Sequence, residues 1–371
     1  MNAYFNVKAA EKKLQFSELK CHTMLIHKAK NINQVSELKV DIWRQEHDDK
    51  NNFIETFDGE HTVKETAQTK YLGCILSKDG TNTKNIKMKV NKAIGIRKVI
   101  QTLIKGLGKY TVEGGIIYFK SLLRGSLLYA AESMLNLKEK DVKLLEGAEE
   151  ATLRDLVKTE RSAPRHMLYL ELGIITARYV IKQRKLILLK HILMQNENSL
   201  MKKVFNAQLK YPSKGDWISE VKTILKELNI ENTFEEIKEM AKNKLTQIVK
   251  LSIEKNALTY LTNIQKQKQK GKEINYTKLL LQPYMRPREN INLKSQREIF
   301  ALRTKMNHIK ANFCSSKYIE KCNKCNFEMD NSHLFKCTRK NIENINYNHI
   351  LNGTILEQRN AINYLNEIMI E

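Results

Sequence analysis

The spacing of apolar residues changes from strand-like to helical near Thr81, and this change sets the expected fold class. Before Thr81, short apolar stretches at 19–27, 37–43, 61–66 and 70–77 are separated by polar residues, as in short strands. After it, six apolar residues fall within an arc of about 100° at 3.6 residues per turn: Ile86, Ala93, Ile96, Ile100, Leu103 and Ile104. The pattern predicts an α+β protein that is predominantly α-helical.

Glycine, proline and capping residues predict where the later elements begin and end. Gly106 and Gly108 end the helix that follows Thr81, and three more helical patterns follow, over about 111–135, 138–160 and 175–195. Pro212 and Gly215 predict a loop before a helix that starts near Asp216, and the polar run 265–273 predicts a solvated linker or helix end. Two capping-box pairs predict further helix starts: Ser295 with Glu298, and Thr354 with Glu357.

The charge of the chain is strongly positive. It has 371 residues, of which 64 are Lys or Arg and 41 are Asp or Glu, giving a net charge of +23. Self-repulsion of this size destabilises a compact state, so it favours a polyanionic partner such as nucleic acid or an anionic membrane. The alternative is a lysine-rich coding composition without a binding role, since Asn and Ile are also abundant.

A membrane partner and secretion fit the sequence less well. No run approaches the roughly 18 uncharged apolar residues of a spanning helix, and the first residues, MNAYFNVKAAEKK, are charged where a signal peptide is apolar. These features predict a chain that stays inside the cell and has no membrane partner. In a reducing compartment, six cysteines indicate metal binding rather than a disulfide framework.

Lysines are concentrated on the helix predicted after Thr81. Between Lys78 and Arg124 there are eleven Lys or Arg residues and only two acids, Asp79 and Glu113. Four lysines lie opposite the apolar arc: Lys84, Lys87, Lys98 and Lys105. A helix that is buried on one side and lysine-lined on the other can follow a phosphate backbone without reading its sequence. The alternative is an ordinary solvated helix face.

Four metal-ligand residue types fall within a sixteen-residue window at 322–337, CNKCNFEMDNSHLFKC. The spacing is C-x2-C-x7-H-x3-C, and structural zinc takes four thiolate or imidazole ligands in a tetrahedron. We therefore predict a structural Zn²⁺ held by Cys322, Cys325, His333 and Cys337. Cys314 is excluded because only the 322–337 set contains two close pairs; the alternative is a group of free cysteines near a surface histidine.

Residues 10–26 read AEKKLQFSELKCHTMLI and residues 70–80 read KYLGCILSKDG. Together they resemble the distal palm of reverse transcriptases encoded by non-LTR retrotransposons. In that resemblance Lys20 matches a palm lysine near the departing pyrophosphate, and Tyr71, Leu72 and Gly73 match the primer-grip turn. Residues 126–154 are similar to the family's thumb, and 302–313 are similar to the helix that precedes its CCHC zinc knuckle.

The resemblance implies four regions and a partner. They are a palm remnant with β-structure at 1–78, a helical thumb at 79–195, a helical connector at 196–294 and a zinc-knuckle region at 295–371. The implied partner is RNA or an RNA–DNA hybrid. It would be bound through the thumb and the knuckle, together with the remainder of a reverse transcriptase, in a ribonucleoprotein of the nucleus or cytoplasm.

One departure from the family pattern limits the expected activity. Two-metal polymerase chemistry needs carboxylates to hold the ions, and this sequence contains no Y-x-D-D box. Its only Asp-Asp pair, Asp48 and Asp49, lies in polar surroundings typical of a loop. We therefore expect no polymerisation by this chain alone, with Mg²⁺ required only if the missing palm is supplied. Without the aspartates, Lys20 also fits a solvated lysine at a strand end.

A second class of function fits the same features. The chain would then be a helical, zinc-containing interaction protein whose basic face meets an acidic protein. Binding to phosphates should weaken steeply with salt concentration, whereas a mainly apolar protein interface should not.

Overall fold

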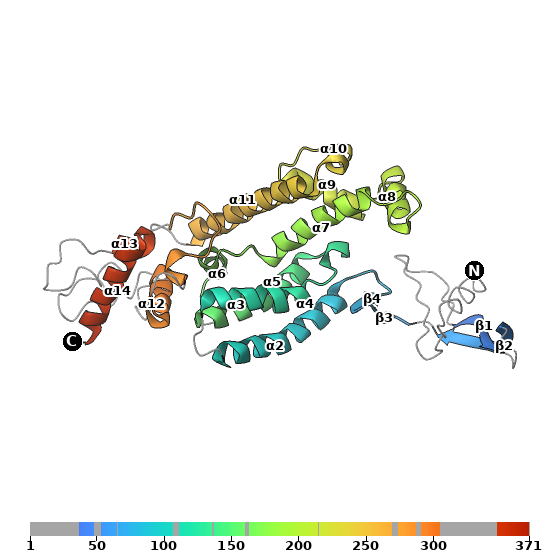
Figure 1. Cartoon of the computed structure of the whole chain (residues 1–371), viewed down its shortest axis with the longest axis horizontal. Helices are drawn as coiled ribbons and strands as arrows, with labels where there is room; N and C mark the ends of the chain where they lie inside the picture. Colours follow the sequence, from blue (N-terminus) through green and yellow to red (C-terminus); the bar gives the residue numbers. More distant parts are fainter. Residues whose placement is uncertain are drawn as a thin grey trace. The chain divides into compact units, whose positions relative to one another are not determined.

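The computed structural model describes residues 37–47, 53–64, 66–106, 111–135, 137–159, 163–213, 215–268, 274–286, 291–304 and 347–370. Most of these residues are helical, and two small antiparallel sheets account for the strands (Figure 1). The prediction of a predominantly helical α+β protein is therefore confirmed. The chain divides into two compact units, Met1–Met88 and Lys89–Glu371, and the division falls inside a helix.

The first helix given by the structure is α2 (Thr83–Gly106). The α-helices that follow it are α3 (Val112–Tyr118), α4 (Arg124–Leu127), α5 (Glu139–Val157), α6 (Arg165–Leu172), α7 (Ala177–Leu193), α8 (Leu200–Lys210), α9 (Trp217–Glu227), α10 (Phe234–Glu239), α11 (Lys242–Lys268), α12 (Leu293–Thr304), α13 (Tyr347–Asn352) and α14 (Ile355–Ile370). Shorter helical segments are the π-helical η2 (Phe119–Leu123) and the 3-10 turns η3 (Ala131–Ser133) and η4 (Pro283–Met285). None of the helices in the described ranges is both long and apolar enough to span a bilayer.

The first sheet pairs β1 (Glu37–His47) with β2 (Phe53–Lys64) in antiparallel register. Ile42 pairs with Gly59 and the next residue, Trp43, pairs with Phe57, so Asp58 is the extra residue of a β-bulge. The strand predicted at 37–43 is thus four residues longer, and the one predicted at 61–66 is the end of a longer strand. Part of the segment interpreted as polar loop therefore belongs to β1.

The second sheet is a tight hairpin of β3 (Gln68–Tyr71) and β4 (Cys74–Ser77). Its two turn residues, Leu72 and Gly73, both have positive φ, 44° and 79°. Two successive residues in this region form the type of turn whose twist matches that of the flanking strands. The two positive φ angles allow β3 and β4 to pair across a two-residue turn. Leucine rarely adopts a positive φ, so Leu72 is an unusual residue at this position.

The predicted Asp-Gly turn leads into α2. The Asp79 carboxylate accepts hydrogen bonds from Thr81 N at 3.0 Å and from Thr81 Oγ1 at 2.9 Å, and Gly80 has a φ of 64°. These backbone and hydroxyl donors hold the pKa of Asp79 below its ordinary value. The turn predicted at this position is confirmed, and the structure describes α2 as far as Gly106, the first of the two glycines predicted to end it.

One predicted helix is confirmed over 112–127 but is irregular and ends earlier than expected. The pattern at 111–135 is divided into α3, η2, α4 and η3, with a turn at 128–130 in which Ala130 has a φ of 53°. The apolar residues keep their helical spacing through the π-helical segment: Val112, Ile116, Phe119, Leu123 and Leu127 are all buried. The packing of one continuous face therefore tolerates a change in helix type that periodicity does not reveal.

Helix starts depend on single capping residues. Asp216 caps α9 by accepting a hydrogen bond from Ser219 N at 2.6 Å, as predicted. Thr354 and Glu357 form the predicted reciprocal cap of α14, with Thr354 N donating to Glu357 Oε2 at 2.6 Å and Glu357 N donating to Thr354 Oγ1 at 3.3 Å. The predicted cap at Ser295 is wrong: Asn292 caps α12, and Ser295 lies inside the helix as the donor.

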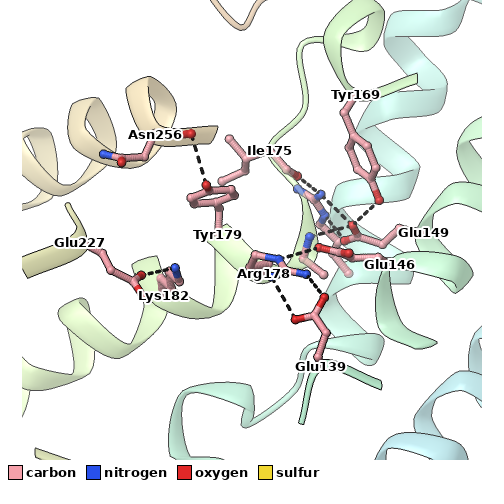
Figure 2. Close-up of polar contacts among 12 residues, drawn as sticks. Glu139, Glu146, Glu149, Tyr169, Ile175, Arg178, Tyr179, Lys182, Glu227 and Asn256 are labelled. Atoms are coloured by element: carbon pink, nitrogen blue, oxygen red, sulfur yellow. Dashed lines mark hydrogen bonds and ion pairs between the residues drawn. The ribbon is translucent and has the colours of Figure 1, made fainter. Parts of the chain in front are cut away.

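Helix α7 is central to the packing of the second unit. It contacts α5 on one side and α9, α10 and α11 on another (Figure 1). Tyr179 of α7 donates a hydrogen bond to the carbonyl of Asn256 in α11 at 3.2 Å (Figure 2). The Trp217 indole of α9 donates to the carbonyl of Glu132 at 2.9 Å. These contacts join segments that the sequence assigned separately to a thumb and a connector.

Candidate nucleic-acid interface

Helix α2 has one buried and one exposed face. Four apolar side chains of the predicted arc are buried: Ile86, Ala93, Ile100 and Ile104. Ile96 is half-buried and Leu103 is exposed, so the predicted arc was too wide at that side. Two further apolar residues of α2, Ile94 and Val99, are exposed. Sequence analysis did not identify these two residues.

The cations of α2 divide into internal and external groups. Lys89 is buried, donates to the carbonyl of Tyr129 at 2.6 Å and lies 5.1 Å from the centre of the Tyr129 ring. Arg97 binds both oxygens of Asp155, at 2.5 and 2.7 Å, and the Asp155 hydrogen bond is the largest cause that raises the pKa of Arg97. Lys89 is therefore buried in the fold, whereas Arg97 remains partly exposed but is held by Asp155.

The remaining lysines of α2 face solvent. Lys84, Lys87 and Lys98 are exposed as predicted, and Lys92, which sequence analysis did not single out, is exposed as well. Among the residues that the structure describes, none of these four forms an ion pair within 4 Å. The backbone of Lys105 belongs to the last turn of α2, but its side chain lies outside the described part.

The hairpin turn is exposed within the first unit. Tyr71 and Leu72 are 62% and 72% exposed, so two large side chains next to Gly73 are accessible to solvent. The hairpin is tied to the start of α2 because Ile75 N donates to the Asn85 side chain at 3.1 Å. The first unit therefore brings the turn residues Tyr71, Leu72 and Gly73 onto the same local substructure as Lys84 and Lys87.

The other predicted site residues lie outside the described residues. They are Lys20, the pair Asp48 and Asp49, and the four zinc ligands Cys322, Cys325, His333 and Cys337. Within the described ranges, no group of three or more His, Cys, Asp or Glu side chains is placed to hold a metal ion. The two helices that flank 305–346 do meet: Arg303 in α12 donates through Nη1 to the carbonyls of Ile350, at 3.0 Å, and Leu351 in α13.

A cluster of buried charges around Glu149 joins α4, α5, α6 and α7. Glu149 of α5 accepts from Arg124 Nε at 2.6 Å, from the Tyr169 hydroxyl at 3.2 Å and from Ala177 N at 3.0 Å (Figure 2). Arg124 also donates to the carbonyl of Ile175. Burial raises the pKa of Glu149, and the Arg124 charge opposes that rise. Sequence analysis missed this cluster because its members come from four separate segments.

A second set of charges lies on the surface next to the first. Arg178 of α7 binds both oxygens of Glu139, at 2.6 and 3.1 Å, and its Nε lies 3.4 Å from Glu146 (Figure 2). Lys182 pairs with Glu227 of α9. Acidic residues of α5 and α9 thus neutralise Arg178 and Lys182 of α7. The four exposed lysines of α2 form no ion pair within 4 Å among the described residues, although the charge of Lys84 acts on nearby Asp79.

The burial of Glu150 should make the stability of the protein depend on pH. Burial raises the pKa of Glu150 from 4.5 to about 7, although Arg165 Nε at 3.0 Å and Arg154 Nη1 at 3.8 Å oppose the rise. The folded protein binds the Glu150 proton more tightly than the unfolded chain does, so protonated Glu150 favours folding. This contribution to the free energy of unfolding is complete below pH 4.5 and is lost as the pH rises through 7. The loss should amount to at most about 3 kcal/mol, at 1.36 kcal/mol per pKa unit.

Glu150→Gln should therefore make the free energy of unfolding less sensitive to pH between 5 and 8, and should make the protein more stable than the parent at pH 8. Urea unfolding of both proteins at the two pH values measures the difference. Glu139→Gln is the matched control, since Arg178 lowers the pKa of exposed Glu139. Equal pH dependence in the parent and Glu150→Gln would contradict the prediction.

In comparisons with known proteins, no family model, no curated protein and no solved structure matches this chain.

Proposed function

We propose that this chain binds RNA or an RNA–DNA hybrid through the exposed face of α2. The observation that carries the proposal is the division of the α2 cations: Lys89 and Arg97 are used internally, whereas Lys84, Lys87, Lys92 and Lys98 are exposed. Exposed ammonium groups on one helix attract phosphates and release their counterions. The net charge of +23 adds long-range attraction for a polyanion.

The exposed turn supplies a second kind of contact. Tyr71 and Leu72 are large, exposed and adjacent to Gly73, in the same unit as Lys84 and Lys87. A tyrosine ring can stack on an unpaired base, and such contacts tolerate any sequence because every base has a π-face. The proposal therefore includes Tyr71 as a stacking residue, in agreement with the resemblance of this turn to a primer grip.

Charge reversal on α2 tests the proposal. A Lys84→Glu/Lys87→Glu/Lys92→Glu/Lys98→Glu variant should bind all RNA sequences more weakly. Its plot of log affinity against log salt should be shallower by roughly 3 to 4 units, at about 0.9 for each phosphate that the protein no longer neutralises. Fluorescence anisotropy with labelled RNA and hybrid duplexes, at salt concentrations from about 50 to about 300 mM, measures both effects.

The matched control reverses four exposed lysines on α8, α9 and α11: Lys203, Lys226, Lys244 and Lys255. It has the same net charge as the α2 variant, so an equal loss of binding in both would mean that total charge, not α2, is responsible. A parent protein that prefers poly-glutamate to RNA would instead favour the acidic-protein partner. Unchanged RNA binding in the α2 variant would refute the proposal.

We also propose one structural Zn²⁺ per chain, held by Cys322, Cys325, His333 and Cys337. The donor set supports the proposal: three thiolates and one imidazole at this spacing suit tetrahedral zinc.

Elemental analysis of the pure protein should give one zinc per chain. Cys322→Ser should abolish it and increase amide hydrogen exchange in α13 and α14, because bound metal contributes to folding. Cys314→Ser should leave both unchanged. Retention of full zinc by Cys322→Ser, or its loss only in Cys314→Ser, would refute the ligand assignment.

A further inference from the structure

A polar pocket of about 260 Å³ lies within the second unit, away from α2. Its walls come from the segment η2–α4, the loop after α6, α7 and α11, which are far apart in the sequence. The polar side chains that line it are Lys120, Arg124, Gln183, Lys250 and Glu254. Three of these five side chains are cationic and one is anionic, so the pocket attracts anions.

Two lysines converge on this pocket without partners. Lys120 is in the π-helical segment η2 and Lys250 is in α11, and both are exposed. Neither forms an ion pair or a side-chain hydrogen bond with the residues that the structure describes. Glu254, one turn after Lys250, lies more than 4 Å from both ammonium groups, since no ion pair joins them. Each lysine therefore has three N–H donors available to a ligand.

The charges in the pocket repel one another. Loss of surrounding water is the largest cause that lowers the pKa of Lys120, followed by the charges of Arg124 and Lys250, while Glu254 opposes the change. A bound anion would remove this repulsion. Arg124 itself is fixed in place by Glu149 and the carbonyl of Ile175, so it is a fixed part of the wall whose charge Glu149 largely compensates, and Lys120 and Lys250 supply the free positive charge.

The local backbone supports a ligand site. π-Helical turns are rare, insert one residue into a helix and occur frequently at functional sites. Here the segment Phe119–Leu123 places Lys120 at the pocket while Phe119 and Leu123 remain fully buried. The helix thus keeps its core contacts and presents a lysine at the same time.

We propose that this pocket binds a phosphate group, held by the ammonium groups of Lys120 and Lys250 and oriented by the Gln183 amide and Arg124. Tetrahedral oxyanions match convergent ammonium and amide donors. The phosphate is provided either by a free phosphate ion or by the end of a polynucleotide, and both present the same oxygens. This site is separate from α2, so it does not rest on the proposed function.

Isothermal titration of the full chain with inorganic phosphate, in phosphate-free buffer at constant ionic strength, tests the pocket. A 5′-phosphorylated oligonucleotide and its unphosphorylated counterpart form the second pair of ligands. Lys120→Gln and Lys250→Gln should each weaken phosphate binding by about 10-fold or more, the usual effect of losing one charge-assisted hydrogen bond. The double variant should lose saturable binding, and Glu254→Gln should tighten it.

Two controls separate the site from general charge. Lys203→Gln/Lys244→Gln removes the same charge from exposed positions and should bind phosphate as the parent does. The fourfold α2 variant should also keep phosphate binding, whatever happens to its RNA binding. The Lys120→Arg/Lys250→Arg variant should retain binding if positive charge is what the pocket supplies.

The outcomes are distinct. Loss of inorganic-phosphate binding in the double variant supports the proposal with a free ion as ligand. Loss of a preference for the 5′-phosphorylated oligonucleotide, without binding of the ion, supports it with a polynucleotide end as ligand. The proposal is overturned if the parent shows neither form of binding, or if the double variant binds as the parent does.

Discussion

Arg303→Met should lower the free energy of unfolding by about 3–5 kcal/mol, the usual effect of breaking a buried ion pair on one side. Arg303 of α12 and Glu171 of α6 are both buried, with Arg303 Nε 2.9 and 3.0 Å from the two Glu171 oxygens. The Tyr284 hydroxyl donates to Glu171 Oε2 at 2.7 Å, and the Tyr276 hydroxyl donates to Oε1. Removing Arg303 leaves a buried carboxylate with only neutral donors.

The substitution also removes the link to α13. Arg303 Nη1 donates to the carbonyls of Ile350 and Leu351, and both acceptors would lose this partner. The two tyrosine rings lie 5.9 and 5.6 Å from the guanidinium centre, so its attraction to their faces disappears as well. We therefore expect α13 and α14 to exchange their amide hydrogens faster than α5 or α7 in the variant.

Two further variants separate charge from packing. Glu171→Leu/Arg303→Met removes both charges and should recover part of the stability, because no charge is then buried alone. Tyr284→Phe removes one neutral donor and should cost about 1–2 kcal/mol. Urea unfolding measures all three variants. If Arg303→Met differs from the parent by less than about 1 kcal/mol, within the range of an exposed pair, the buried pair is not a major source of stability.

Gly173→Ala should cost about 3–5 kcal/mol, because two penalties act at one residue: positive φ for an L side chain and overpacking. Gly173 ends α6 with a φ of +63°. A Cβ there would lie 2.1 Å from the carbonyl carbon of Leu280 and 2.2 Å from the nitrogen of Leu281. These neighbours are backbone atoms, and Gln282 N donates to the Glu171 carbonyl at 3.0 Å, so the segment is held against the helix end.

Gly147→Ala is the matched control for this prediction. Gly147 lies inside α5, and a Cβ there would meet nothing within 4 Å. Alanine should therefore stabilise the protein by about 0.5–1 kcal/mol, since glycine inside a helix loses more conformational freedom on folding. Thermal and urea unfolding of the two variants should give changes of opposite sign. A Gly173→Ala protein as stable as Gly147→Ala would show that the 280–282 segment can move away.

Local features of the fold could be predicted from the sequence because they depend on residues close together in the chain. The start of α9 at Asp216, the cap of α14 by Thr354 and Glu357, and the Asp-Gly turn before α2 each involve hydrogen bonds over a few residues. The buried face of α2 follows from its 3.6-residue periodicity. The predominantly helical fold class was predictable for the same reason.

The use of each charged residue was decided by tertiary structure. Periodicity counts Lys84 and Lys89 alike as cations of one helix, yet Lys84 is exposed and Lys89 is buried against Tyr129. Glu171 and Arg303 are 132 positions apart, and nothing near either residue in the sequence marks it as buried. A charge is buried only where a distant segment supplies a partner that compensates for the loss of hydration. The sequence therefore determines where helices form, while the packing of distant helices determines which cations remain free to bind a phosphate.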